Sequence, residues 1–246
     1  MTQNNQLIKV GFLYPGYAAE DDYPLLGQMV SPKVDVKLIH TKFNEDAHTV
    51  EALSEMGSPQ RIKEGTKALV GTGIQSVLWT STSASFVLGL EGIKKQIATL
   101  EASLQVPAST TALAFIRAAK TIGAKRVAIA ATYPEDIALL FKTFLESFDI
   151  EVLQYSSKGI ITAAEVGTLQ KEEVLRFAVD NDCPGADAVF IPDTALHSAA
   201  WIEELEQLLQ KPVLTANQVS FWEALRLTGQ FTPQKRLGTL FKKSCS

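Results

Sequence analysis

The stretch Val77-Leu-Trp-Thr-Ser-Thr-Ser83 decides the fold, because the chain repeats its pattern as Val189-Phe-Ile-Pro-Asp-Thr-Ala195. Each copy is an apolar run that ends in small hydroxyl or carboxyl residues. A second echo follows each copy, Leu100-Glu-Ala-Ser-Leu-Gln-Val-Pro107 and Leu205-Glu-Gln-Leu-Leu-Gln-Lys-Pro212. A repeat this long exceeds solenoid periods and indicates two copies of one α/β half. Two halves that face each other would place Ser81 and Asp193 on opposite walls of one cleft.

The composition excludes several classes of protein. The 246 residues are 46% hydrophobic and 20% charged, with a net charge of −4, as in ordinary globular proteins. Dispersed lysines and arginines form no basic patch for nucleic acid, and no apolar run approaches the roughly 20 residues of a membrane span. Met1–Gln6 is polar and lacks the apolar core of a signal peptide. We expect a cytoplasmic protein that binds neither nucleic acid nor membrane; the sequence leaves open a homo-oligomer.

The cysteines and glycines give no sign of a metal or cofactor. Cys183 and Cys245 are the two cysteines, and neither has the spacing of a metal ligand. Gly71-Thr-Gly73 lacks the third glycine and the following helix of a dinucleotide fingerprint. We therefore expect neither a metal nor a cofactor.

Short β-rich runs alternate with helical patterns along the chain, which predicts parallel sheets with covered faces. Ser58 and Pro59 mark the start of one helix, and Gly123 marks the end of another. The expected strands are 10–14, 34–39, 76–79, 127–131, 151–155, 188–192 and 213–214, and the expected helices are 58–70, 112–122, 134–148 and 200–210.

Loops after the expected strands are the candidate ligand-binding segments, because ligands of open parallel sheets sit beyond the carboxyl ends of the strands. These loops are rich in hydroxyl and small residues, which suits a small carboxylate held by side-chain hydroxyls and backbone N–H groups. The segments are Pro15-Gly-Tyr-Ala-Ala-Glu20, Thr80–Ser85, Ser109–Thr111, Thr132–Pro134, Asp193–Ala195 and Thr215–Gln218.

Simpler roles compete with each of these interpretations. The run Thr80–Ser85 and Asp193 could serve as helix N-caps, and Tyr133 could be a packed aromatic. His197, one turn after Asp193, suggests an Asp-His pair, but a lone histidine on a helix is more often structural. Cys183 precedes a strand, at the end of the sheet away from the chemistry. The three tryptophans, Trp79, Trp201 and Trp222, would form core or cleft wall.

At these residues the chain resembles the aspartate/glutamate racemase superfamily, within it the branch of maleate cis-trans isomerases and arylmalonate decarboxylases. The segments that carry the resemblance are Val10–Pro15, Thr80–Phe86, Gly185–Leu196, Lys211–Gln218, Phe221-Trp222 and Ala224–Arg226. The resemblance implies an α/β fold of two pseudo-symmetric parallel-sheet lobes with the active site between them. We expect residues 1–115 plus 215–246 to form the first lobe and residues 116–214 the second.

Two positions depart from the family pattern. In the racemases and isomerases a cysteine follows each repeated strand, whereas Ser81 and Asp193 stand there in this chain. Decarboxylase-like members keep only the second cysteine, which delivers a proton to an enediolate. A serine cannot replace a thiolate without an adjacent base, but an aspartate can give or take a proton. One wall therefore retains acid–base chemistry, and the other has become a binding surface.

The resemblance assigns roles to the remaining loop residues. Thr82, Ser83 and Tyr133 would bind a substrate carboxylate, Thr194 would hold its opposite side, and Asn217 would orient a polar group. Pro15, Gly16, Tyr17 and Ala195 complete the expected substrate site, with Tyr17, Tyr23, Trp79 and Phe86 setting a side pocket.

These roles predict a cofactor-independent lyase, decarboxylase-like, acting on a small di- or oxo-carboxylate with Asp193 as general acid or base. The alternatives are a maleate-type isomerase or racemase-like enzyme that uses Asp193 and Ser81 in altered roles, and a non-catalytic carboxylate-binding protein.

Overall fold

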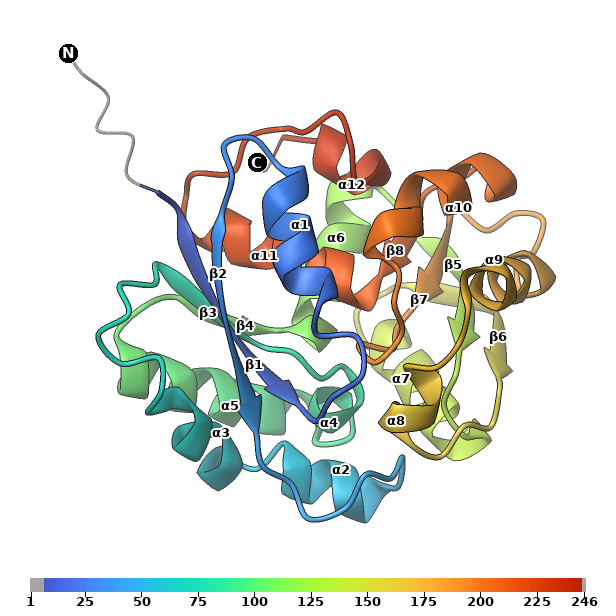
Figure 1. The fold of residues 1–246 in the computed structure, drawn as a ribbon. Coiled ribbons are helices and arrows are strands. Elements are labelled where there is room, and N and C mark those ends of the chain that lie inside the picture. Colours follow the sequence, from blue (N-terminus) through green and yellow to red (C-terminus); the bar gives the residue numbers. More distant parts are fainter. Residues whose placement is uncertain (1–6, 245–246) are drawn as a thin grey trace.

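Two four-stranded parallel sheets form the framework of the computed structural model, which describes residues 7–244 (Figure 1). The strand orders are β2-β1-β3-β4 and β6-β5-β7-β8. The strands are β1 (Lys9–Pro15), β2 (Asp35–Thr41), β3 (Ser76–Trp79), β4 (Ala108–Thr110), β5 (Arg126–Ala131), β6 (Glu151–Ser157), β7 (Ala188–Ile191) and β8 (Val213–Thr215). Because the two orders are the same, β3 and β7 occupy equivalent places, as the repeat predicts. Met1–Gln6 and Cys245 lie outside the described residues.

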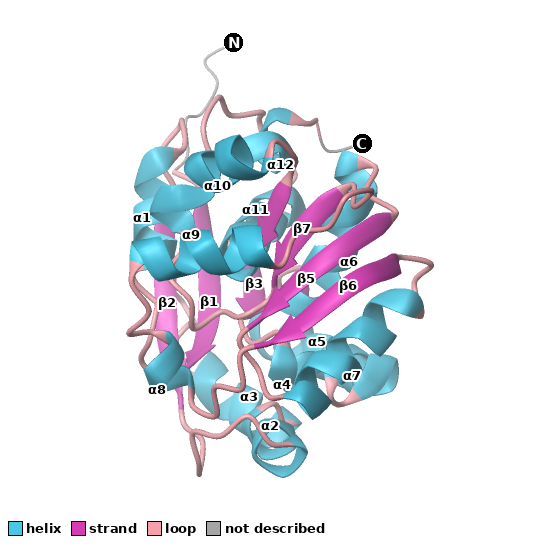
Figure 2. Cartoon of the chain, turned by 90° about the vertical axis from the view of Figure 1, so that its right-hand side faces the viewer, coloured by secondary structure: helices cyan, strands magenta, loops and turns pink. Residues whose placement is uncertain are grey.

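Helices cover both faces of each sheet (Figure 2). In the first half they are α1 (Asp22–Met29), α2 (Val50–Met56), α3 (Pro59–Thr66), α4 (Ser83–Phe86), α5 (Gly89–Leu104) and α6 (Thr111–Ile122). In the second half they are α7 (Glu135–Glu146), α8 (Ala163–Val166), α9 (Lys171–Asp180), the 3-10 helix η1 (Ala199–Trp201), α10 (Ile202–Leu209), α11 (Ala216–Leu227) and α12 (Gly238–Lys242). The α/β fold inferred from the sequence is confirmed.

Alternation along β5 shows how a sheet with two covered faces is built. Val127, Ile129 and Ala131 point into the large core that also contains the first half, whereas Ala128 and Ala130 point into a smaller core. Successive side chains of a strand point to opposite faces of the sheet. Because both faces are buried here, the strand needs an uninterrupted run of apolar residues.

The repeat extends to the backbone. Gln105 and Gln210, which the second echo aligns, both end their helices in the left-handed conformation, with φ of 55° and 53°. Five residues later, Thr110 and Thr215 both cap the next helix with their hydroxyls. The two halves therefore share the conformation that ends one helix and the threonine that caps the next, as well as their strand order.

The helix that directly follows the last strand of each sheet packs against the other sheet. Helix α11 follows β8 but lies on the first sheet, where Phe221 stacks on Phe12 of β1 with ring centroids 6.3 Å apart. Helix α6 follows β4, and its Phe115 lies 5.4 Å from Phe190 of β7. The division of the chain into residues 1–115 plus 215–246 and residues 116–214 stays a prediction.

Three segments expected to be loops contain regular structure, and the first of them, Thr80–Ser85, includes the start of α4. Ser109–Thr111 contains the end of β4 and the start of α6, and Thr215–Gln218 contains the end of β8 and the start of α11. A strand of three residues is too short to show an alternating pattern. In addition, the hydroxyls that suggested loops serve here as helix caps. The helix that begins after Ser58 ends at Thr66 rather than at Val70.

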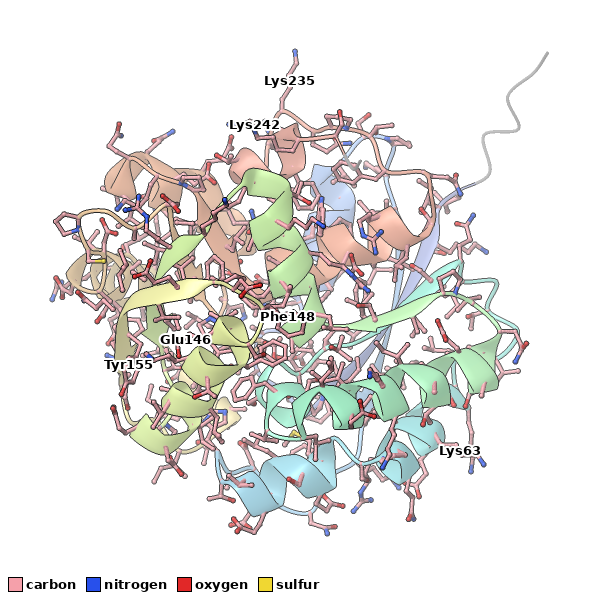
Figure 3. The ribbon with its side chains drawn as sticks, turned by 180° about the vertical axis from the view of Figure 1, so that it is seen from behind. Lys63, Glu146, Phe148, Tyr155, Lys235 and Lys242 are labelled. Atoms are coloured by element: carbon pink, nitrogen blue, oxygen red, sulfur yellow. The ribbon has the colours of Figure 1, made fainter. Side chains whose placement is uncertain are left out.

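The charged surface is dispersed. Lys63, Lys235 and Lys242 point away from the body of the molecule, with Lys63 at the end opposite to the other two (Figure 3). No helix within residues 7–244 is both long and apolar enough to span a membrane.

Candidate active site

A cavity of about 260 Å³ lies where the carboxyl ends of β1, β3 and β7 converge. This is the place that the topology of open parallel sheets favours for a ligand. Ser81 follows β3 and Asp193 follows β7 at the same distance from the strand end, and both line the cavity. The predicted site residues that the structure brings together here are Pro15, Gly16, Tyr17, Ser81, Ser83, Asp193, Thr194 and Ala195.

Ser81 is both a helix cap and a cavity residue. Its Oγ accepts a hydrogen bond from the backbone N–H of Ala84 at 3.2 Å, and its carbonyl accepts one from the hydroxyl of Ser85 at 2.9 Å. The capping role proposed for this run of hydroxyls is thus real. Capping uses only a lone pair of Oγ, and no described residue accepts the hydroxyl hydrogen of Ser81. That hydrogen is available to a ligand.

Asp193 is fixed by two hydrogen bonds, one on each carboxylate oxygen. Oδ1 accepts from the N–H of Ala195 at 2.9 Å, and Oδ2 accepts from the hydroxyl of Thr132, which follows β5. Residues 194–195 form a turn and not a helix, so Asp193 does not act as a helix N-cap. The side chain is only 4% exposed. A carboxyl group held in one orientation at a cavity wall is suited to directed proton transfer.

Two buried tyrosines donate hydrogen bonds to the backbone carbonyls on either side of Asp193. The hydroxyl of Tyr14 donates to the carbonyl of Thr194 at 3.0 Å and accepts from the N–H of Ala19 at 3.1 Å. Burial raises the pKa of Tyr14 well above its ordinary value. Burial first, and then the charge of Asp193, raise the pKa of Tyr133 in the same way. Both phenols therefore stay neutral and act as hydrogen-bond donors.

Three predicted binding residues do not line the cavity. Tyr133 is buried and donates its hydroxyl to the carbonyl of Pro192 at 2.8 Å. Asn217 donates to Oδ2 of Asp22 at 3.0 Å and to the carbonyl of Leu196. Thr82 is buried. These three side chains are therefore buried and do not line the cavity.

The expected side pocket is mostly core. Tyr23, Trp79 and Phe86 are buried in the large core and do not line the cavity, whereas Tyr17 does. Trp222 is also buried in that core, and Trp201 packs at the edge of the smaller one. Large aromatic rings bury most of their area in the core, which is the reason these residues face inward.

The loop after β2 supplies cavity residues that the sequence analysis missed. Asp46 accepts from the N–H groups of Ala163 and Ala164 at 2.9 and 3.0 Å, at the start of α8. His48 binds the loop before α8 through two hydrogen bonds. The lining residues not predicted are Tyr14, Phe43, Asp46, Ala47, His48, Leu53, Met56, Ala163 and Ala164. Only Tyr14 had a signal in the sequence, its place beside Pro15 at the end of a predicted strand.

His197 and Cys183 lie away from the cavity. His197 contacts Asp21 through Nε2 at 2.8 Å and makes no pair with Asp193. Cys183 is partly buried, and its carbonyl accepts from Nζ of Lys211 at 3.2 Å. Neither residue lines the cavity, in agreement with the secondary roles expected for them.

Asp22 is a buried carboxylate that ties three elements together. Its Oδ2 accepts from the N–H groups of Ser198 and Ala199 at 2.9 and 3.1 Å and from Asn217 at 3.0 Å. Burial raises the pKa of Asp22 above its ordinary value, and the three donors oppose that rise. Through Ser198 and Ala199 this carboxylate anchors the segment that continues from Asp193.

Comparison with known proteins decides the family. The arylmalonate decarboxylase family matches residues 41–241. The chain belongs to this family. The curated arylmalonate decarboxylase of Bordetella bronchiseptica is 23% identical over 172 residues, which are 69% of this chain and 72% of that protein.

Solved structures of the arylmalonate decarboxylase and maleate isomerase groups share the fold. A mutant arylmalonate decarboxylase in the liganded form has a TM-score of 0.82 at 21% identity, covering 95% of this chain and 98% of that chain. The maleate isomerase of Pseudomonas putida S16 has a TM-score of 0.85 at 21% identity, covering 96% and 99%. The maleate cis-trans isomerase of Nocardia farcinica, solved with a covalently bound succinylcysteine intermediate, has a TM-score of 0.85 at 19% identity, covering 96% and 98%. This arylmalonate decarboxylase family member is thus an enzyme with the expected two-sheet fold.

Proposed function

We propose that this enzyme is a cofactor-independent decarboxylase of a small di- or oxo-carboxylate, with Asp193 as the proton donor. The observation that carries the proposal is the position of Asp193, which lines the cavity at the site equivalent to Ser81 and is held by Thr132 and Ala195. Family membership supports decarboxylase or isomerase chemistry. A single positioned acid is sufficient for decarboxylation, whereas a two-thiol racemization needs a second group.

The reaction follows from this one acid. When a carboxylate leaves as CO₂, the electron pair of the broken C–C bond stays on the α-carbon, and the neighbouring carbonyl or carboxylate delocalises it as an enolate or enediolate. Protonated Asp193 then delivers its proton to that carbon, so that a C–H bond replaces the C–C bond. Water returns the proton to Asp193. Hydroxyl donors from Ser81 and Ser83 would stabilise the developing oxyanion, because preorganised donors are most effective where charge develops.

Two parallel assays test the proposal. Decarboxylation predicts that CO₂ is released from one or more substituted malonates, and that maleate is not converted to fumarate. Fumarate formation without release of CO₂ would replace the proposal by a maleate-type isomerisation. The absence of both reactions over a broad set of di- and oxo-carboxylates would favour a binding protein.

Ser83→Ala should weaken binding of a carboxylate by about 1.5–3 kcal/mol, the usual contribution of a hydrogen bond to a charged group. Ser83 lines the cavity at the start of α4. Calorimetric titration with malonate measures the effect. Ser109→Ala is the control, because Ser109 is equally buried but accepts a hydrogen bond from Arg117 outside the cavity. Unchanged affinity in Ser83→Ala would move the carboxylate to another wall.

Cys183→Ala should retain the turnover of the wild type, and iodoacetamide should inactivate neither protein. The reason is that Cys183 does not line the cavity and that the two positions equivalent in the repeat hold Ser81 and Asp193. Residual activity after thiol alkylation is the measurement. Complete inactivation of the wild type that substrate prevents, and that Cys183→Ala abolishes, would bring a thiol into the chemistry.

A further inference from the structure

The charges around the cavity do not match an anionic substrate. Asp46 and Asp193 both line it. Among the described residues that line the cavity, none is a lysine or an arginine. A dicarboxylate that enters would therefore meet the carboxylate of Asp46 beside the carboxyl group that donates the proton, in a partly enclosed space where like charges repel more strongly than in water. A positive charge beside the ligand would offset this repulsion.

His48 is the described lining residue that can carry such a charge. Its ring is held from two sides: Nδ1 lies 3.0 Å from the carbonyl of Ile160, and the ring packs edge-on against Tyr133 with centroids 5.0 Å apart. Its backbone N–H also donates to the carbonyl of Ile161 at 2.6 Å. The side chain is 6% exposed. The ring of this histidine is thus buried and held in one orientation.

The hydrogen bond to Ile160 fixes which ring nitrogen meets a ligand. A carbonyl oxygen can only accept, so Nδ1 of His48 carries a hydrogen. The neutral ring then has its lone pair on Nε2, and no described residue bonds to that atom. When Nε2 takes up a proton, the ring becomes a cation with a donor that is free for a ligand.

The other two histidines have different surroundings. His40 bonds to the carbonyl of Gly16 and stacks on Tyr17, and His197 contacts Asp21. Neither lines the cavity. The titratable groups that share the cavity with His48 are Asp46 on its own loop, Tyr14 in β1, Tyr17 after β1, and Asp193 after β7. The ring of Tyr133 packs against that of His48.

We propose that His48 binds one carboxylate of the substrate through Nε2 and takes up a proton there as the anion enters. The inference rests on the proposed function in one respect, the choice of a small dicarboxylate as ligand. His48 thereby supplies the positive charge that the cavity otherwise lacks. Because a proton enters with the anion, it offsets one negative charge of the ligand in the site.

Titration with malonate in buffers of different ionisation enthalpy tests this inference. In the wild type, the affinity for malonate should fall by up to about tenfold per pH unit at pH values above the range in which imidazole titrates. The reason is that each binding event then takes up a proton from solvent. The binding enthalpy should depend on the buffer and report uptake of up to one proton. His48→Gln and His48→Asn should both lose this linkage and bind malonate at least tenfold more weakly at about pH 6.

The variants are chosen to separate charge from folding. His48→Asn keeps a donor near the position of Nδ1 for the carbonyl of Ile160, and His48→Gln keeps a neutral polar group near Nε2. His197→Gln is the matched control, because it removes an imidazole outside the cavity and should leave the proton linkage intact.

Binding that is independent of pH and buffer in the wild type would overturn the role of His48. So would full proton linkage in both His48 variants. In either case malonate still binds, and the proposed substrate class survives. Failure of malonate to bind the wild type at any pH between about 5 and 8 would overturn this inference together with the proposed function.

Discussion

Asp193→Asn should lower turnover by about 10²–10⁴-fold, the usual contribution of general acid–base catalysis, and the variant should remain folded. An asparagine keeps the shape of the side chain and an oxygen that can accept from the N–H of Ala195. It removes the proton that the α-carbon would receive. Initial rates of CO₂ release, with the melting temperature of the same preparation, measure both effects.

A second pair of variants distinguishes catalysis from turn stabilisation. If Asp193 only caps its turn, Asp193→Ala should melt at a lower temperature and remain active, and Asp193→Asn should behave as the wild type. Asp187→Asn is the control, since Asp187 also accepts backbone hydrogen bonds, from Lys125 and Arg126, but lies outside the cavity. Wild-type turnover by Asp193→Asn would rule out Asp193 as the proton donor.

Asp22→Ala should lower the free energy of unfolding by more than about 3 kcal/mol. It leaves three buried donors, the N–H groups of Ser198 and Ala199 and the amide of Asn217, without their acceptor, and each unsatisfied buried group costs about 1–3 kcal/mol. Urea denaturation measures the loss. Asp21→Ala is the matched control, because its side chain is 75% exposed and its contact with His197 lies at the surface. A change below about 1 kcal/mol in Asp22→Ala would show that the three donors find other acceptors.

The pH dependence of Asp22 has a definite sign. Burial raises its pKa, so in the range above the ordinary value of 3.8 the folded state holds more protons at this site than the unfolded state. The contribution of Asp22 is therefore most favourable at acid pH and is lost as pH rises through the folded pKa. We expect the stability difference between the wild type and Asp22→Asn to fall with rising pH above 3.8.

The repeat made the location of the site predictable. The placement of Ser81 and Asp193 after equivalent strands follows from residues that occur twice. Because the two sheets have the same strand order, residues that follow equivalent strands lie at the carboxyl ends of both sheets, where ligands bind. For this reason eight of the predicted residues line the cavity, although the sequence alone gives no distance between them in space.

The cavity residues that could not be predicted from the sequence are held by contacts between distant segments. His48 and Asp46 lie in a loop that neither echo covers, and what fixes them is the backbone of residues 160–164, more than a hundred positions away. Tyr133 and Asn217 show the opposite error. Their places after strands were predicted correctly, but the partners that turn them inward, Pro192 and Asp22, could not be read from local pattern.

The exchange of α6 and α11 bears on how such a chain could arise. The helix after the last strand of each sheet packs on the other sheet, so neither half alone would have an intact core. Phe115 would lose its contact with Phe190, and Phe221 would lose its contact with Phe12. Two separate copies of one half would solve this problem by swapping their last helices in a symmetric dimer. Joining the end of one copy to the start of the next would give a single chain with the present order of elements. In a symmetric dimer the two strand-end positions must be identical, whereas a single chain can hold Ser81 at one and Asp193 at the other.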